Sequence, residues 1–278
     1  MTDSSACLRP RTAAALRVRV VPLQVSLGEW LFADDAVEPA AFYARLRAEP
    51  DTLPTTSQPS PGAWAAAFTA AAEAGADRLL VLTCGAQLSG THASARLAAD
   101  LSPVPVDLVD SQTISGGLHL VVLALARALG SGDCYDDVLA LAQSLSGRIW
   151  STWSGDTTRL LAAGGRDGGA LAADDAGTGV PVLGLEGSVR VLGHARSPED
   201  SVRLQAERLR AALAAVPGRV TVGHGDAAAL ADDLAGALAG APGLEGIDRY
   251  EVPPSVGAHA GAGNVGASYV APRASARG

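Results

Sequence analysis

The sequence predicts an α/β protein with a parallel sheet in its N-terminal half and a second, smaller α/β domain after it. Between residues 55 and 129, apolar strand-like segments alternate with helix-like segments, a pattern typical of a parallel sheet with helices on both faces. Hydrophobic residues make up 48% of the chain and aromatic residues 4%, which indicates an Ala/Val/Leu core. The 278 residues are enough for two domains. We place the N-terminal domain at 1–150 and the C-terminal domain at 151–278, the latter ending in a disordered tail.

The N-terminal half begins with a strand at residues 17–26, where β-branched residues recur. A helix at 61–74 is expected because Ser60 is a good N-cap, Pro61 suits the first helical position, and Gly75 can end the helix in a left-handed conformation. The remaining elements expected here are helices at 39–48, 91–101 and 115–129 and strands at 78–83 and 104–109.

The C-terminal half has a different pattern, in which Glu186-Gly187 separates two strand-like segments and suggests a hairpin. Ser197 and Pro198 predict the start of a helix that reaches about Val216. Residues 164–179 are rich in Gly, Asp and Ala and indicate a loop or a poorly formed helix. The other expected elements are strands at 148–154, 180–185, 188–194, 220–224 and 247–252 and helices at 157–163 and 226–238.

Composition excludes several classes of function. The net charge of −8 argues against a general nucleic-acid surface. All 21 basic residues are Arg, so a lysine nucleophile or Schiff base is excluded. The three cysteines form no zinc or redox motif, and no histidine spacing indicates a metal. We find neither a signal peptide nor an apolar run long enough for a membrane span, and expect a cytoplasmic protein without stable membrane insertion.

Three Ser/Thr-rich segments, each followed by a helix-like stretch, are the main candidates for a binding site: TTSQPSPG, LSGTHASA and DSQTISGG. A fourth fragment of this kind, TDSSA, lies at residues 2–6. Hydroxyls and free N–H groups at helix starts bind anions, and parallel sheets bind ligands beyond the carboxyl ends of their strands. The alternative interpretation is that these residues only cap helices.

These segments resemble the successive signatures of the DegV family, and the resemblance covers nearly the whole chain. It rests on Thr56 to Ser60, Leu88 to Thr91, Asp110-Ser111 with Ser115, Gly164 to Arg166, and Val256 to Gly263. The family fold is the expected two-domain α/β fold. Family membership implies binding of a long-chain fatty acid, whose carboxyl is presented to the ATP-binding subunit of fatty acid kinase for acyl phosphate formation. It implies no cofactor and no catalytic residue in this chain.

The resemblance implies a set of residues that bind the fatty acid around its carboxyl head group, which we call head-group residues: Thr56, Ser57, Ser89, Gly90, Thr91, Ser115, Arg196 and His259. His259 lies in the segment GAHAGAG, which we interpret as a Gly-rich loop. The sequence departs from the family in that His segment, where a Pro is usual, and at its start. The hydrophobic strand that normally leads into TDS is missing, and residues 2–5 could be a frayed terminus.

Two other functions stay open at this point. A small-molecule transferase or hydrolase could use Ser89 and His259, although the nucleophile-elbow motif G-x-S-x-G is absent. A degenerate relative that binds no lipid would follow if the first strand were lost.

Overall fold

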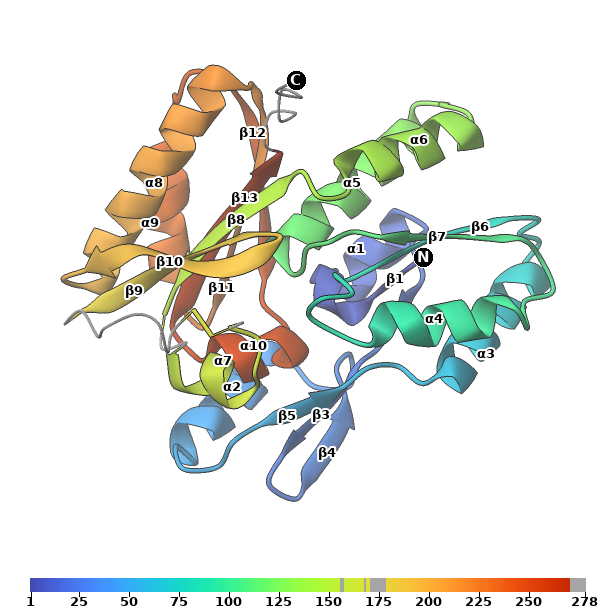
Figure 1. Ribbon diagram of the computed structural model, residues 1–278, viewed down its shortest axis with the longest axis horizontal. Helices are drawn as coiled ribbons and strands as arrows, with labels where there is room; N and C mark the ends of the chain where they lie inside the picture. Colours follow the sequence, from blue (N-terminus) through green and yellow to red (C-terminus); the bar gives the residue numbers. More distant parts are fainter. Residues whose placement is uncertain (156–157, 168, 171–178, 271–278) are drawn as a thin grey trace.

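The computed structural model describes residues 1–155, 158–167, 169–170 and 179–270, and the strands within them form three sheets (Figure 1). The four-stranded sheet has the order β2 (Val20–Val21), β1 (Thr2–Asp3), β6 (Leu79–Thr83) and β7 (Val106–Asp110). The six-stranded sheet has the order β10 (Ser188–Ala195), β9 (Val180–Glu186), β8 (Ile149–Ser154), β13 (Asn264–Val270), β11 (Gly218–Gly225) and β12 (Leu244–Glu251). The third consists of β4 (Trp30–Ala33), β3 (Gln24–Leu27) and β5 (Thr55–Ser57).

The four-stranded sheet is parallel throughout and has helices on both faces, which confirms the predicted fold class. Helices α3 (Pro61–Glu73) and α4 (Thr91–Ala99) cover one face, and α5 (Gly116–Gly130) and α6 (Tyr135–Leu145) cover the other. Strand β6 shows why the sheet is buried on both sides. Val81 packs with Trp64 and Phe68 of α3, whereas Leu82 packs with the α5 cluster. Successive side chains of a strand point to opposite faces, so both must be apolar here.

The expectation that the first strand is missing was wrong. Strand β1 has two residues, yet it lies inside the sheet between β2 and β6. The terminal amine of Met1 donates to the Leu80 carbonyl at 2.6 Å, and Thr2 and Asp3 are fully buried. Thr2 and Asp3 are therefore held by parallel pairing. Ser4 and Ser5 are buried in the short helix that follows, so residues 2–5 are not frayed.

The six-stranded sheet is mixed, with a single parallel pair, β11 and β12. Helices α8 (Pro198–Ala215) and α9 (Ala228–Leu238) cover its outer face, on the left of Figure 1. Helix α5 packs against β8, β11 and β13 on the opposite face. The same helix also covers the four-stranded sheet, and this double role explains why its residues from Gly116 to Leu123 are all buried.

Most predicted elements were found within a few residues of their expected ends. The 39–48 helix is α2 (Pro39–Ala48), and β9 and β10 form the expected hairpin. Ser60 caps α3 by accepting from the Ala63 amide at 3.1 Å, and Gly75 follows the helix with φ of +93°. Helix α7 (Thr158–Ala163) also matches, whereas the predicted disordered tail and most of the Gly-rich loop lie outside the described residues.

Several features were not predicted. The expected strand at 17–26 is broken at Pro22, so that β2 and β3 belong to different sheets. Helices α1 (Pro10–Ala15) and α6 and strands β4, β5 and β13 were missed. The GAHAGAG segment is not a loop, because Pro254–Ala260 form helix α10, which ends at Gly261 with φ of +75°. The boundary near residue 150 falls inside β8, and the domain division stays a prediction.

No helix in the described parts of the chain combines the length and apolar character needed to cross a bilayer.

Candidate ligand-binding cavity

A single large cavity lies between the two main sheets and receives residues from both halves of the chain. Together with the open space at its mouth it has a volume of about 1020 Å³. From the first half it is lined by Ser5, Thr56, Cys84, Ser89, Ile114 and Ser115. The second half contributes Ser151, Trp153 and Leu185 from the sheet and Val256 and His259 from α10. Four of the predicted head-group residues, Thr56, Ser89, Ser115 and His259, are thus brought to one cavity.

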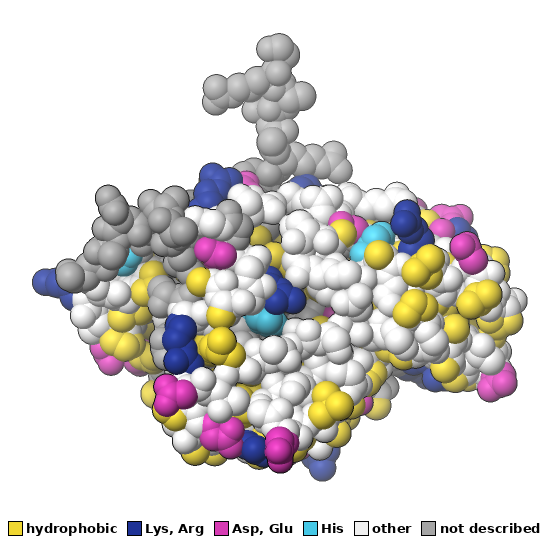
Figure 2. Space-filling model, turned by 60° about the horizontal axis from the view of Figure 1, so that its bottom comes forward, with side chains coloured by type: hydrophobic (Ala, Val, Ile, Leu, Met, Phe, Trp, Pro, Cys, Tyr) yellow, Lys and Arg dark blue, Asp and Glu magenta, His cyan; other side chains and the backbone are white. Residues whose placement is uncertain are grey.

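Thr56 and His259 form the polar end of the cavity. The Thr56 Oγ1 and His259 Nε2 atoms are 2.8 Å apart, although the residues are far apart in sequence. Arg166 lines the same cavity, and its guanidinium donates to the Gly164 carbonyl at 2.6 Å. No carboxylate in the described chain forms an ion pair with Arg166. Figure 2 shows a histidine beside a basic side chain in a hollow on this side of the molecule.

His259 is held neutral at this end of the cavity. Burial, with a further contribution from the Arg166 guanidinium, lowers the pKa of His259 to about 4. The Nδ1 atom is buried and has no hydrogen-bond partner in the described residues. Gly164 lies so close that a Cβ there would come within 2.8 Å of Nδ1. The loop after α7 therefore covers one edge of the imidazole, and Nε2 faces Thr56.

The second Ser/Thr segment is fixed against the first by side-chain contacts. Ser94 donates to the Pro59 carbonyl at 2.6 Å, and the Gln58 side chain lies where a Cβ on Gly90 would be. The two segments therefore pack directly on each other: the Gln58 side chain needs the space left by the missing side chain of Gly90, and Ser94 satisfies the Pro59 carbonyl. Ser89 lines the cavity and shares a 2.8 Å hydrogen bond with Thr91.

Gly90 and Thr91, predicted as head-group residues, do not line the cavity. Gly90 is the N-cap of α4, and Thr91 is fully buried behind Ser89. Both position Ser89, since the Thr91 amide also donates to the Ser89 hydroxyl at 3.2 Å.

The N-terminal fragment joins the remaining loops. The buried Asp3 carboxylate accepts from the Ser5 hydroxyl at 2.5 Å and from the Cys84 amide at 2.8 Å, just after β6. The Ser115 amide donates to the Ser5 carbonyl at 3.0 Å, just before α5. Asp3 and Ser5 therefore hold the loops that carry Ser89 and Ser115 beside each other at the carboxyl end of the parallel sheet.

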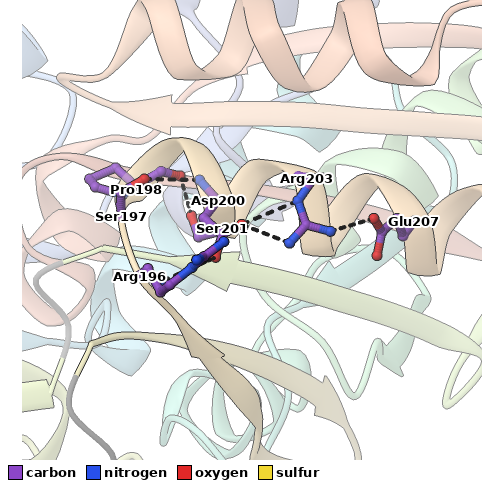
Figure 3. Close-up of polar contacts among 7 residues, drawn as sticks. All are labelled: Arg196, Ser197, Pro198, Asp200, Ser201, Arg203 and Glu207. Carbon is purple, nitrogen blue, oxygen red and sulfur yellow. Dashed lines mark hydrogen bonds and ion pairs between the residues drawn. The ribbon is translucent and has the colours of Figure 1, made fainter.

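Two other predicted site residues lie away from the cavity. Ser57 is exposed at the end of β5, and alternation along the strand turns it away from the side on which Thr56 lies. The Arg196 side chain is 92% exposed and lies 3.7 Å from Asp200. Figure 3 shows it on the segment just before α8, beside the first turn of that helix, which carries Arg203 and Glu207. The structure does not bring Arg196 to the cavity, because α8 covers the outer face of that sheet.

Arg166 is the site residue that sequence reasoning missed. Gly164-Gly165-Arg166 was noted as a family-like segment, but the role of its cation was not inferred. The signal was the pair of glycines before the Arg, because Gly164 permits the close approach to His259.

Ser89 and His259 do not form a nucleophile–base pair. The Ser89 hydroxyl is bonded to Thr91, and the imidazole is bonded to Thr56. No carboxylate orients His259 among the described residues, as a catalytic triad would require. The geometry does not favour the hydrolase alternative. The degenerate alternative loses its basis too, since β1 is present.

The protein thus has an α/β fold with a cavity between two sheets, and hydroxyls and an arginine lie among the lining of that cavity. A model of the DegV family, described as uncharacterised proteins, matches residues 1–272. The chain belongs to the DegV family.

Relatives and solved structures agree with this assignment. The chain is 32% identical over 272 residues to a DegV domain-containing protein of Streptomyces coelicolor, covering 96% of this chain and 95% of the relative. A DegV family protein from Thermus thermophilus, whose structure is described as showing fatty acid binding, is 31% identical with a TM-score of 0.86, and the match covers 98% of each chain. A Thermotoga maritima protein described as having a fatty acid binding function shares the fold at 24% identity and a TM-score of 0.84, over 98% of each chain.

Proposed function

We propose that this protein binds a long-chain fatty acid and presents its carboxyl to the ATP-binding subunit of a fatty acid kinase. The observation that carries the proposal is the cavity, which has Thr56, Ser89, Arg166 and His259 around its polar end and mainly apolar walls beyond it. A molecule with one anionic group and a long hydrocarbon chain matches both parts. The fatty acid binding described for the Thermus thermophilus relative supports the same ligand class.

The polar end suits a carboxylate in charge and in donors. When the neutral imidazole carries its proton on Nε2, it donates to Thr56 Oγ1, and the Thr56 hydroxyl proton is free to point at a ligand. Arg166 supplies a cation that has no carboxylate partner among the described ion pairs. A bound carboxylate would also favour protonation of His259, opposing the burial that lowers its pKa.

The walls supply the affinity. Leu161, Leu185 and Val189 form one apolar cluster at the cavity, and Val252 and Val256 belong to another. Burial of about 0.8 kcal/mol per methylene gives a long acyl chain on the order of 10 kcal/mol of driving force. The chain would thus stay bound while the carboxyl, near the open mouth, remains within reach of a partner enzyme.

The proposal is tested by lipid extraction and mass spectrometry of the purified protein, followed by uptake of palmitate or oleate after delipidation. We expect one fatty acid per chain. Phosphate transfer from ATP is then measured with a cognate kinase subunit. His259→Ala should reduce acyl phosphate formation more than lipid binding, since most of the affinity comes from the tail. A protein that neither carries nor takes up a fatty acid would overturn the proposal.

A further inference from the structure

The wall of the cavity contains a pair of serine hydroxyls far from the polar end. Ser151 on β8 and Ser268 on β13 are neighbours across the six-stranded sheet, and both line the cavity. Their exposed fractions are 8% and 2%. Their hydroxyl oxygens are 2.7 Å apart. A hydrocarbon chain alone would give these groups nothing to bond.

One of the two hydroxyl protons of the Ser151–Ser268 pair has no hydrogen-bond acceptor. Two hydroxyls carry two protons, and a single hydrogen bond between them uses one. In the part of the chain that the structure describes, neither hydroxyl has a hydrogen-bond partner besides the other serine. On either side in the sheet register, Ser151 faces Leu185, and Ser268 faces Thr221, whose hydroxyl donates to the Gly116 carbonyl at 2.9 Å. One donor therefore remains unused and almost fully buried at the cavity wall.

A second serine pair, between strand β8 and helix α8, differs in that both of its hydroxyl protons have an acceptor. Ser154 and Ser201 are 2.6 Å apart on the face covered by α8. There the Ser201 hydroxyl donates to the Pro198 carbonyl at 2.6 Å, which leaves Ser154 to donate to Ser201. Both protons are used, and Gln205 adds a donor to Ser154 at 3.1 Å. This pair is structural and does not line the cavity, so an unused donor is not a general feature of serine pairs in this fold.

The position of the pair along the cavity is set by β13. Asn264, at the start of the strand, is bonded to the Gly261 carbonyl at the end of α10, the helix that carries His259. Ser268 lies four residues further along, which corresponds to roughly 13 Å at the rise of a strand. A ligand anchored at Thr56 and His259 would pass the serine pair in the middle or distal part of its chain.

We infer that the cavity takes acyl chains bearing a mid-chain oxygen, such as hydroxy fatty acids, with Ser151 and Ser268 as the subsite that binds that oxygen. This inference rests on the proposed function and names its substrate class more narrowly. A chain hydroxyl can accept the unused proton and donate in return to the oxygen of a serine. A plain hydrocarbon at the same place leaves a buried donor unpaired, which lowers its affinity relative to the hydroxylated chain.

The experiment compares stearate with a series of hydroxystearates that carry the hydroxyl at successive mid-chain carbons, by titration of the delipidated protein. We expect the affinity to peak at one hydroxyl position, where it exceeds that of stearate roughly tenfold, the effect of one hydrogen bond of about 1.4 kcal/mol. The variant carrying both Ser151→Ala and Ser268→Ala should lose this preference and bind the hydroxystearate no more tightly than stearate, because the ligand hydroxyl then has no partner.

Two further variants make the test specific. Each single variant, Ser151→Ala or Ser268→Ala, keeps one hydroxyl with one unused proton, so the preference should persist. Ser154→Ala removes a serine of the satisfied pair on the other face of β8, and should leave the preference unchanged even where it lowers stability. Binding of stearate by every variant shows that each is folded.

The outcomes separate the inference from the proposed function. Tight binding of stearate without a preference for any hydroxystearate would overturn the inference and leave the proposed function standing. A preference that survives in the double variant would overturn the assignment to these two serines. Failure of all these lipids to bind the wild-type protein would overturn the proposed function, and the inference with it.

Discussion

The parallel sheet and the mixed sheet contribute to the cavity in different ways. The parallel sheet contributes its strand ends: β1, β6 and β7 each lead into a loop whose serine, Ser5, Ser89 or Ser115, lines the cavity. The mixed sheet contributes the interiors of its strands, where Ser151 and Ser268 form a wall. Residues at strand ends form recognisable motifs, whereas residues inside strands are hidden in an alternating pattern.

The largest expected effect tests whether the two sheets fold as one unit. Phe68 packs under the parallel sheet and Leu209 under the mixed sheet, and both are fully buried. Phe68→Ala should lower the free energy of unfolding by about 3–5 kcal/mol and Leu209→Ala by about 2–5 kcal/mol. Because α5 packs on both sheets, both variants should move the same single transition in chemical denaturation.

Exposed Leu129 is the control for that comparison, and Leu129→Ala should change stability by less than about 0.5 kcal/mol. Two separate transitions, each moved by one variant alone, would show that the sheets unfold independently.

The next effect is a pH dependence centred on α10, which bridges the two regions. The pKa of His259 is lowered from 6.5 to about 4, so its stabilising contribution is complete above pH 6.5 and is lost as the pH falls towards 4. The loss amounts to on the order of 3 kcal/mol at most. His259→Gln should remove it, so that this variant gains stability relative to wild type as the pH falls through that window, measured by denaturation at several pH values.

Asp34 should act in the opposite sense. It accepts from the Ser255 amide at 2.7 Å at the start of α10, and burial raises its pKa from 3.8 to about 6. Its contribution is therefore complete below pH 3.8 and is lost as the pH rises towards 6. Asp34→Asn should remove this dependence, and an equal pH profile in wild type and variant would contradict the assignment.

A smaller effect distinguishes strand-end hydroxyls that face the cavity from those that do not. Thr56→Val and Ser89→Ala should each weaken fatty acid binding by about 1–3 kcal/mol, the cost of leaving a carboxylate short of a donor. Ser57→Ala is the matched control next to Thr56, since Ser57 is exposed and does not line the cavity. Titrations in which all three variants bind like wild type would place the carboxylate elsewhere.

The smallest effect concerns a helix end beneath the parallel sheet. Gly75 has φ of +93° and no neighbour near its Cα hydrogens. Gly75→Val should cost about 1 kcal/mol through backbone strain alone, because there is no clash to relieve. Gly130 is equally uncrowded but has ordinary helical φ, and Gly130→Ala should therefore not destabilise. Equal melting temperatures for wild type and Gly75→Val would show that the positive φ at Gly75 causes no backbone strain in the variant.

The sequence predicted the parallel sheet well because its signals are local. Each signal is contained in a short stretch of sequence: the helix cap at Ser60, the apolar strand before Cys84 and the apolar helix after Ser115. Predictions failed where long-range pairing decides the structure. Strand β13 follows a Gly-rich segment and has Gly266, Ala267 and Ser268 at its centre. It pairs with β8 and β11 on either side, which no local pattern reveals. The position of Arg196 away from the cavity is likewise not visible in the sequence, since only the packing of α8 shows which side of the sheet it occupies.

The cavity also depends on both ends of the described chain. Ser5 lies just after the first strand, β1 is inserted between strands that come later, and Ser268 lies in the last strand. During synthesis, the loops made early lack the β13 part of the opposite wall until β13 has been made and paired. A nascent chain or a fragment clipped before β13 therefore has no closed site. In such a fragment Ser151 would lack its neighbour Ser268, and this part of the cavity wall would be missing.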